Sequence, residues 1–168
     1  KDGRQVFLKQ YISPKPSVDW FNGYVAYQNE LKSRIQNSSL KDVTYEFIDF
    51  FEATRPPRNN PVSNLFYQVF EWIEEGQDLS TVIKKLRNDP ASFSGVQRHT
   101  WAKVIMGSIK QLHQSKIVHT DLKPENLILI PDETIEIKYR LKLIDMDFSL
   151  LSDNLYFFIG ASNKWSTL

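Results

Sequence analysis

The 168-residue sequence contains no cysteine, which excludes disulfides and thiolate metal sites. A cysteine-free chain fits a reducing compartment, and we expect a cytoplasmic protein. No apolar run approaches the roughly 18 residues that a membrane span needs, and no signal-peptide pattern opens the chain. The net charge of +1 gives no reason to expect a nucleic-acid partner. With 41% hydrophobic and 24% charged residues, the composition is that of a globular domain with an apolar core.

The chemistry is concentrated in one stretch, residues 118–126, which reads Val-His-Thr-Asp-Leu-Lys-Pro-Glu-Asn. Within six residues it supplies an acid, a lysine and an amide, namely Asp121, Lys123 and Asn126. An apolar run follows directly, and a second apolar run ends in Asp145. Phosphoryl transfer needs a carboxylate to orient the attacking hydroxyl, a cation near the moving phosphate, and oxygen ligands for magnesium. The pattern therefore predicts a phosphotransferase site.

The H-x-D-x-x-x-x-N spacing from His119 to Asn126 resembles the catalytic loop of the eukaryotic-type protein kinases, and residues 122–126 resemble their serine/threonine branch. The resemblance implies an α+β, two-lobed protein-kinase-like fold and ATP-dependent transfer to a serine or threonine hydroxyl of a protein substrate. It implies that Asp121 and Lys123 are catalytic and that Asn126 and Asp145 hold Mg²⁺. The histidine is expected to pack and hydrogen-bond the loop.

Further landmarks of this family follow in order along the chain. Residues 6–9 resemble the strand whose lysine binds the phosphates of the nucleotide, and Glu30 lies in a helical stretch where the family's helix C carries that lysine's ion-pair partner. Residues 66–79 resemble the fifth strand and the hinge that receives adenine. The resemblance implies an ATP site made of Lys9 with Glu30, Phe7, the gatekeeper Phe70, the backbones of Glu71 and Ile73, and Ile128 beneath the adenine.

Three residues depart from the family pattern. Thr120 replaces the arginine that commonly clamps an activation-loop phosphate, so we expect no dependence on that switch. Phe7 stands where alanine is usual, and strand alternation places it on the face of Lys9, where it either stacks on adenine or plugs the pocket. The metal-binding triplet reads Asp145-Met146-Asp147, which makes Asp147 an alternative metal ligand. A pseudokinase scaffold and a small-molecule kinase of the same fold therefore stay open.

Periodicity and turn residues predict the elements that carry these motifs. We expect strands at 6–11, 44–53, 64–73, 127–130 and 140–144, and helices after residue 19, at 79–86 and at 98–114. The first helix should be capped by Ser17 or Asp19, and the last should direct an apolar face inward: Trp101, Val104, Ile105, Ile109 and Leu112. A proline-rich hairpin loop is expected at 54–61.

The family map divides the chain into an N-lobe portion, residues 1–73, and a hinge with a C-lobe portion, residues 74–168. The sequence starts five residues before the strand that carries Lys9, and it stops about where the activation segment would finish. We therefore expect the middle portion of a kinase domain, without the glycine-rich loop and most of the C-lobe. These 168 residues by themselves should be inactive.

Overall fold

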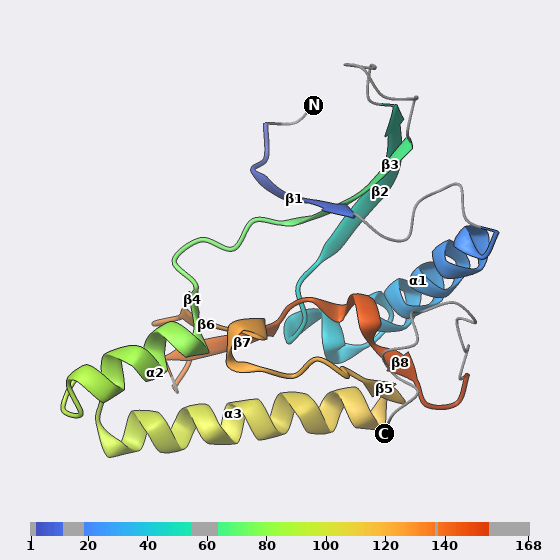
Figure 1. The fold of residues 1–168 in the computed structure, drawn as a ribbon. Helices are drawn as coiled ribbons and strands as arrows, with labels where there is room; N and C mark the ends of the chain where they lie inside the picture. Colours follow the sequence, from blue (N-terminus) through green and yellow to red (C-terminus); the bar gives the residue numbers. More distant parts are fainter. Residues whose placement is uncertain (1–2, 12–18, 55–63, 137, 155–168) are drawn as a thin grey trace, which may run out of the picture.

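The computed structural model describes residues 3–11, 19–54, 64–136 and 138–154. A small twisted sheet lies above a long helix, and a second sheet and two further helices lie below that long helix (Figure 1). The elements in order are β1 (Val6–Tyr11), α1 (Phe21–Gln36), η1 (Ser39–Asp42), β2 (Phe47–Thr54), β3 (Asn64–Glu71), β4 (Gln77–Asp78), α2 (Leu79–Asn88), α3 (Gly95–Gln114), β5 (Ile117–Val118), η2 (Pro124–Asn126), β6 (Leu127–Pro131), β7 (Tyr139–Leu143), η3 (Met146–Phe148) and β8 (Leu150–Leu151). The predicted strands and helices are present with small shifts at their ends, and the predicted loop at 54–61 lies almost entirely outside the described residues.

The upper sheet has the strand order β1-β3-β2, and both pairings are antiparallel. Side chains alternate between its faces, so the inner face of β3 presents the buried residues Phe66, Gln68 and Phe70. The register sets Lys9 opposite Gln68 and Phe7 opposite Phe70, which confirms that Phe7 and Lys9 share one face of β1.

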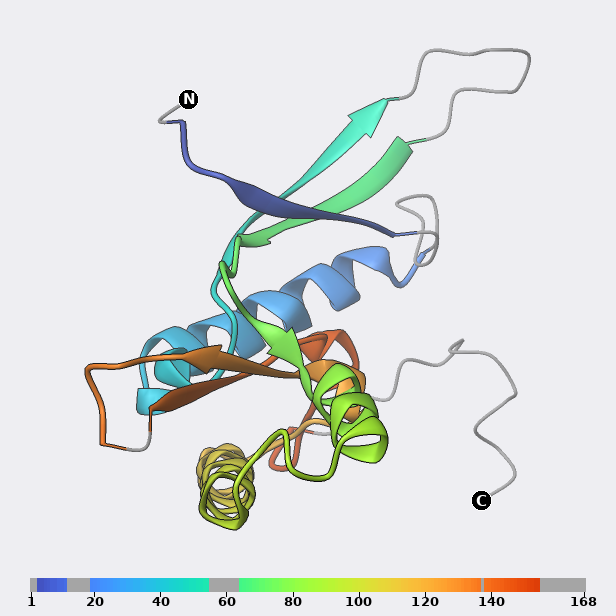
Figure 2. The same ribbon diagram turned by 90° about the vertical axis from the view of Figure 1, so that its left-hand side faces the viewer.

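Helix α1 lies beneath this inner face (Figure 2). The ring of Phe66 packs between Tyr11 at 5.3 Å and Phe21 at 5.2 Å, measured between ring centroids, and so joins the sheet to the helix. The face of α1 toward the rest of the molecule buries Tyr24, Tyr27 and Leu31, while Ile35 is partly buried. An aromatic cluster thus docks α1 against the sheet.

The start of α1 differs from the prediction. Its N-cap residue is Trp20, which makes no side-chain capping hydrogen bond, so Asp19 is not the cap. Ser17 lies outside the described residues. The aromatic contacts of Phe21 fix the first turn through packing, and they replace the polar cap that the sequence pattern indicated.

The lower part is built on the sheet β4-β6-β7 and on α3. Its core is aliphatic and includes Leu40, Leu112 and Leu143, which are almost fully buried. Helices α2 and α3 both have polar N-caps. At the start of α2 the Asp78 side chain accepts a hydrogen bond from the Thr81 amide, and at the start of α3 Ser94 forms a capping box with Gln97. Because this box precedes Gly95, α3 begins three residues earlier than the predicted start at residue 98.

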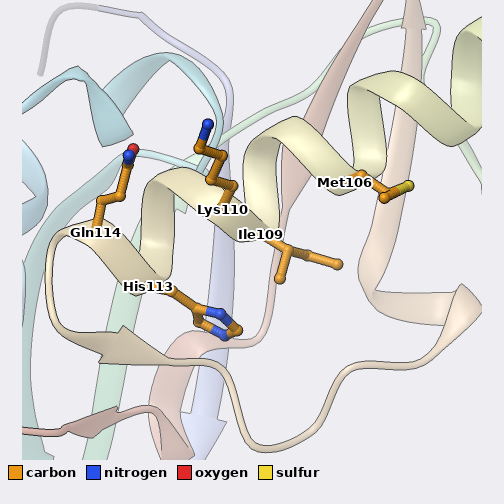
Figure 3. Close-up of a pocket in the computed structure, with 5 residues that line it drawn as sticks. All are labelled: Met106, Ile109, Lys110, His113 and Gln114. Atoms are coloured by element: carbon orange, nitrogen blue, oxygen red, sulfur yellow. The ribbon is translucent and has the colours of Figure 1, made fainter.

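The apolar face of α3 only partly points inward. Trp101 and Leu112 are buried, and Val104 and Ile105 pack against the core. Ile109, however, lines a surface pocket of about 490 Å³ together with Met106, Lys110, His113 and Gln114 (Figure 3). The prediction that Ile109 faces inward is wrong, because Ser108 takes the buried position on that turn.

The two sheets are connected at one corner. The chain entering β2 forms a parallel bridge from Thr44 to Leu143, and the Tyr45 amide donates to the Leu143 carbonyl at 3.1 Å. The predicted boundary at residue 73 falls between β3 and β4 and stays a prediction. Among the described helices, none combines the length and apolar character that crossing a bilayer requires.

Candidate active site

The segment from β5 through η2 brings the three predicted catalytic-loop residues together. The Lys123 ammonium donates to the Asp121 carboxylate at 2.6 Å. The Asn126 amide nitrogen donates to the same carboxylate at 3.1 Å and to the Asp121 backbone carbonyl at 2.8 Å. The hydrogen bond from Lys123, aided by Asn126, lowers the pKa of Asp121 below its ordinary value. The loop therefore presents an ionised carboxylate beside an ammonium group, and both are accessible to solvent.

His119 and Thr120 tie this loop to the segment that follows β7. His119 is buried, and its Nε2 lies 2.9 Å from the carbonyl oxygen of Ile144, as expected for a packing residue. Thr120 has a positive φ of 61°, and its hydroxyl donates to the carbonyl of Phe148 at 2.7 Å. Thr120, which stands where the family has an arginine, therefore links the catalytic loop directly to the segment after Asp145.

A second charged group forms between β1 and the turn η3. The Lys9 ammonium is hydrogen-bonded to both Asp145 and Asp147. Burial lowers the pKa of Lys9, but the charge of Asp147 and the hydrogen bonds to both carboxylates outweigh it, so the pKa is raised overall. We call Lys9, Asp145 and Asp147 the Lys9 cluster. It unites residues that are more than 130 positions apart in the sequence.

The predicted ion pair between Lys9 and Glu30 is wrong. Glu30 accepts hydrogen bonds from Arg34 at 2.6 Å and from Asn154 at 2.9 Å. The residue of α1 that reaches the cluster is Gln28, whose amide donates to the backbone carbonyl of Asp147 at 2.9 Å. Successive residues of a helix are rotated by about 100°, so a shift of two residues turns a side chain to the opposite side.

Gln28 was missed by the sequence analysis, although a signal was available. It lies at helical spacing between Tyr24 and Leu31, so it is a polar residue on an otherwise apolar face. Tyr27 on the same helix also binds the segment after Asp147: its hydroxyl donates to the Ser149 carbonyl at 3.0 Å and accepts from the Leu151 amide at 2.8 Å. Helix α1 therefore fixes this segment through two polar side chains.

The predicted adenine side of the site is aromatic and partly open. Phe70 is buried and stacks on Tyr45 at 4.2 Å. The ring of Phe7 lies 6.4 Å from that of Phe70 and stays 43% exposed, so it does not fill a closed pocket. Ile73 and Ile128 both press on Gly76, where an added Cβ would lie 2.8 Å and 2.6 Å from their side chains. The hinge residue Ile73 and the β6 residue Ile128 therefore meet at this glycine.

Lys142 anchors the start of the hinge and was not identified from the sequence. Its ammonium donates to the Glu71 carboxylate at 2.9 Å and to the Thr44 carbonyl at 3.0 Å. The backbone amide of Glu71 donates to the Glu46 carbonyl at 3.0 Å, so this amide already has a partner. A cavity of about 510 Å³ adjoins these residues and is lined by Glu71, Ile73 and Lys142 among others.

The oxygen donors fit the magnesium ion that the resemblance implies. The carboxylates of Asp145 and Asp147 already converge on one cation, the Lys9 ammonium. The nitrogen of Asn126 is bonded to Asp121, so its amide oxygen is the atom that would bind a metal. Hard cations such as Mg²⁺ take carboxylate and amide oxygens and keep several waters. Within the described ranges, no three His, Cys, Asp or Glu side chains form a metal-binding group by themselves.

Comparisons with known proteins agree with this geometry. Residues 17–156 match the family model described as protein kinase domain. The putative ribosomal protein S6 kinase alpha-2 of Caenorhabditis elegans is 36% identical over 89 residues, which cover 53% of this chain and 10% of that protein. The serine/threonine-protein kinase MPS1 of Saccharomyces cerevisiae is 30% identical over 147 residues, which cover 85% of this chain and 16% of that protein. The chain thus spans only a small part of the length of these relatives.

A solved structure also resembles the chain. The structure described as WaaP in complex with acyl carrier protein matches with a TM-score of 0.61 and 18% identity, covering 91% of this chain and 56% of that one. At this identity the likeness concerns the fold alone. Together with the family match, it confirms the predicted α+β, kinase-like fold, with a small β-rich part and a helical part.

Proposed function

The chain belongs to the protein kinase domain family, and from this membership we propose that the protein transfers the γ-phosphoryl group of MgATP to a serine or threonine hydroxyl of a protein substrate. The observation that carries the proposal is the preassembled group of Asp121, Lys123 and Asn126, in which a carboxylate and an ammonium lie 2.6 Å apart at the surface. The serine/threonine preference is supported by the sequence of residues 122–126 and by relatives of that description.

Asp121 and Lys123 have complementary roles in this proposal. The ionised Asp121 accepts a hydrogen bond from the substrate hydroxyl, orients it toward the phosphorus and takes its proton as transfer proceeds. Lys123 leaves Asp121 to neutralise the charge on the transferred phosphoryl group. The site acts by positioning and electrostatics, and it requires no covalent intermediate.

The nucleotide side is assigned to the residues around the Lys9 cluster. Lys9 would bind the nucleotide phosphates, and Asn126 and Asp145 would hold the magnesium ion. When bound, magnesium supplies charge neutralisation at the phosphates. Adenine would lie between Phe7 and Ile128, bounded by Phe70 and contacted by the hinge backbone at Glu71 and Ile73. The exposed ring of Phe7 is available for stacking on a purine.

The proposal is tested by Asp121→Asn in the full-length protein. Transfer should fall by roughly 100- to 10,000-fold, the usual contribution of a general base, while the dissociation constant for MgATP changes little because the acid contacts the hydroxyl and not the nucleotide. The measurements are phosphate incorporation into a protein substrate and calorimetric titration with MgATP. Glu136→Gln removes an exposed carboxylate in the connection between β6 and β7, outside the loop, and should leave both unchanged. Undiminished turnover of Asp121→Asn would contradict the assigned role.

Two further functions each have one observation in their favour. Phe7 on the cleft face favours a pseudokinase that acts as a binding module without nucleotide. Asp147, an acid two residues after Asp145, favours a small-molecule kinase of the same fold. Absence of MgATP binding would support the first function. Phosphate transfer to amino alcohols or aminoglycosides but not to protein would support the second.

A further inference from the structure

We propose that Asp147 is the fixed counter-ion of Lys9 and takes over the positioning role that a carboxylate on α1 would otherwise have, so that Asp145 alone remains as the acidic magnesium ligand. This inference rests on the proposed function, because the purpose of fixing Lys9 is to present it to the nucleotide phosphates. It makes Asp147 a positioning residue that acts through Lys9.

Helix α1 offers Lys9 no carboxylate. Its sequence contains a single acid, Glu30, and this side chain is held away from the cluster by Arg34 and Asn154. The position that does face the cluster is Gln28, a neutral amide. A half-buried ammonium needs a compensating charge, and here that charge comes from the turn η3.

The two acids of the cluster lie in different environments. The Asp147 side chain is only 5% exposed, whereas that of Asp145 is 30% exposed. A carboxylate this deeply buried needs a partner of opposite charge, and Lys9 is that partner. Asp145, the more accessible acid, can exchange its ammonium partner for a metal ion.

The backbone of Asp147 is held independently of its side chain. Gln28 donates to its carbonyl at 2.9 Å, and the turn is closed by a 2.9 Å hydrogen bond from the Ser149 amide to the Met146 carbonyl. The Asp147 carboxylate therefore has a defined position relative to β1 even when Lys9 turns toward a ligand. Gln28 itself only holds the backbone of the turn and brings no charge to Lys9.

The test measures the KM for ATP, kcat and the magnesium concentration for half-maximal activity in four full-length variants: Asp147→Asn, Asp147→Glu, Asp145→Asn and the control Asp153→Asn. Asp147→Asn should raise the KM for ATP roughly 10- to 100-fold, the range expected for a lost hydrogen bond to a charged group, with little change in the magnesium requirement. Asp147→Glu keeps a carboxylate at this position and should lose much less than Asp147→Asn. Asp153→Asn makes the same substitution at an exposed acid of the same segment and should not change the KM.

Three results would overturn the inference. The first is an unchanged KM in Asp147→Asn, and the second is a magnesium requirement raised as strongly as in Asp145→Asn, which would make Asp147 a metal ligand. The third applies if Asp147→Asn lowers the melting temperature: an Asp147→Glu variant that recovers the melting temperature but not the KM would reduce Asp147 to a folding role. A wild-type protein that neither binds nor uses MgATP would instead contradict the proposed function itself.

Discussion

The catalytic loop and the Lys9 cluster hold their charges in different ways. In the loop, the partners of Asp121 are Lys123 and Asn126, at most five residues away, and the carboxylate is accessible. In the Lys9 cluster, the partners come from β1 and η3, and Gln28 of α1 holds the turn in place. One group is local and open to solvent, whereas the other is assembled from distant segments and partly buried.

This difference means that the catalytic loop and the Lys9 cluster depend on different parts of the fold. The loop geometry follows from a short run of sequence and from the contact of His119 with Ile144. The geometry of the Lys9 cluster depends on the docking of the upper sheet and α1 onto the segment after β7. A mutation in the aromatic cluster under the sheet should therefore disturb nucleotide binding before it disturbs the catalytic acid.

The largest expected effect tests which acid of the Lys9 cluster holds magnesium. Asp145→Asn removes a charge and a hard oxygen donor, so magnesium-dependent ATP binding should weaken by more than roughly 100-fold, beyond the effect typical of residues that only support a metal ligand. Asp147→Asn should keep most of the magnesium dependence. Calorimetric titration with ATP at several magnesium concentrations measures both. Equal losses would indicate a two-acid metal site, and the reverse ranking would transfer the ligand role to Asp147.

The next largest effect is expected from a substitution that disrupts the packing of the upper sheet on α1. Phe66 is almost fully buried between the sheet and α1, so Phe66→Ala should lower the free energy of unfolding by about 3–5 kcal/mol. Phe51→Ala is the matched control, since Phe51 is 40% exposed on β2 and stacks on Tyr67. That variant should lose about 0.5–1.5 kcal/mol. Urea denaturation gives both values, and equal losses would refute the proposed docking role of Phe66.

A smaller effect is expected at α2, which supplies no residue to the catalytic loop or to the Lys9 cluster. Asp78 caps this helix, and hydrogen bonds from Ser80 and Thr81 lower its pKa to about 2. Asp78→Ala should cost about 1 kcal/mol of unfolding free energy at neutral pH. Because the pKa is depressed on folding, this contribution is full above the ordinary pKa of 3.8 and disappears as the pH falls toward about 2. Asp78→Asn keeps a cap that does not titrate, so the Asn variant should show a pH-independent difference from Asp78→Ala.

The smallest effect concerns Phe7, at the edge of the Lys9 cluster. If the ring stacks on adenine, Phe7→Ala should weaken MgATP binding by about 0.5–1.5 kcal/mol beyond the loss of buried area. Leu8→Ala changes the next residue, which points to the other face of β1, and should leave the affinity unchanged. A gain of affinity in Phe7→Ala would show that the ring plugs the pocket, and it would make the protein a pseudokinase.

The same contrast explains how far the sequence could predict the molecule. The Asp121–Lys123–Asn126 group was predictable because its partners are close in sequence and a turn brings them together. Glu30 was misassigned because the rotational phase of α1 is set by aromatic packing against β3, and charge spacing does not show it. Ile109 was misassigned for a similar reason, since the rotation of α3 places Ser108 inward. The strands and helices themselves followed from periodicity, and the errors lie in side-chain direction and at helix ends.

A thermal-shift titration of the full-length protein with ATP and magnesium tests the central claim most directly. The Lys9 cluster and the hinge should bind MgATP, and a ligand that binds only the folded state adds about 2.7 kcal/mol of stability at 100 times its dissociation constant. The melting temperature should therefore rise with MgATP and much less with ATP and a chelator. An unchanged melting temperature at millimolar MgATP would contradict the account and leave a kinase-like scaffold without nucleotide.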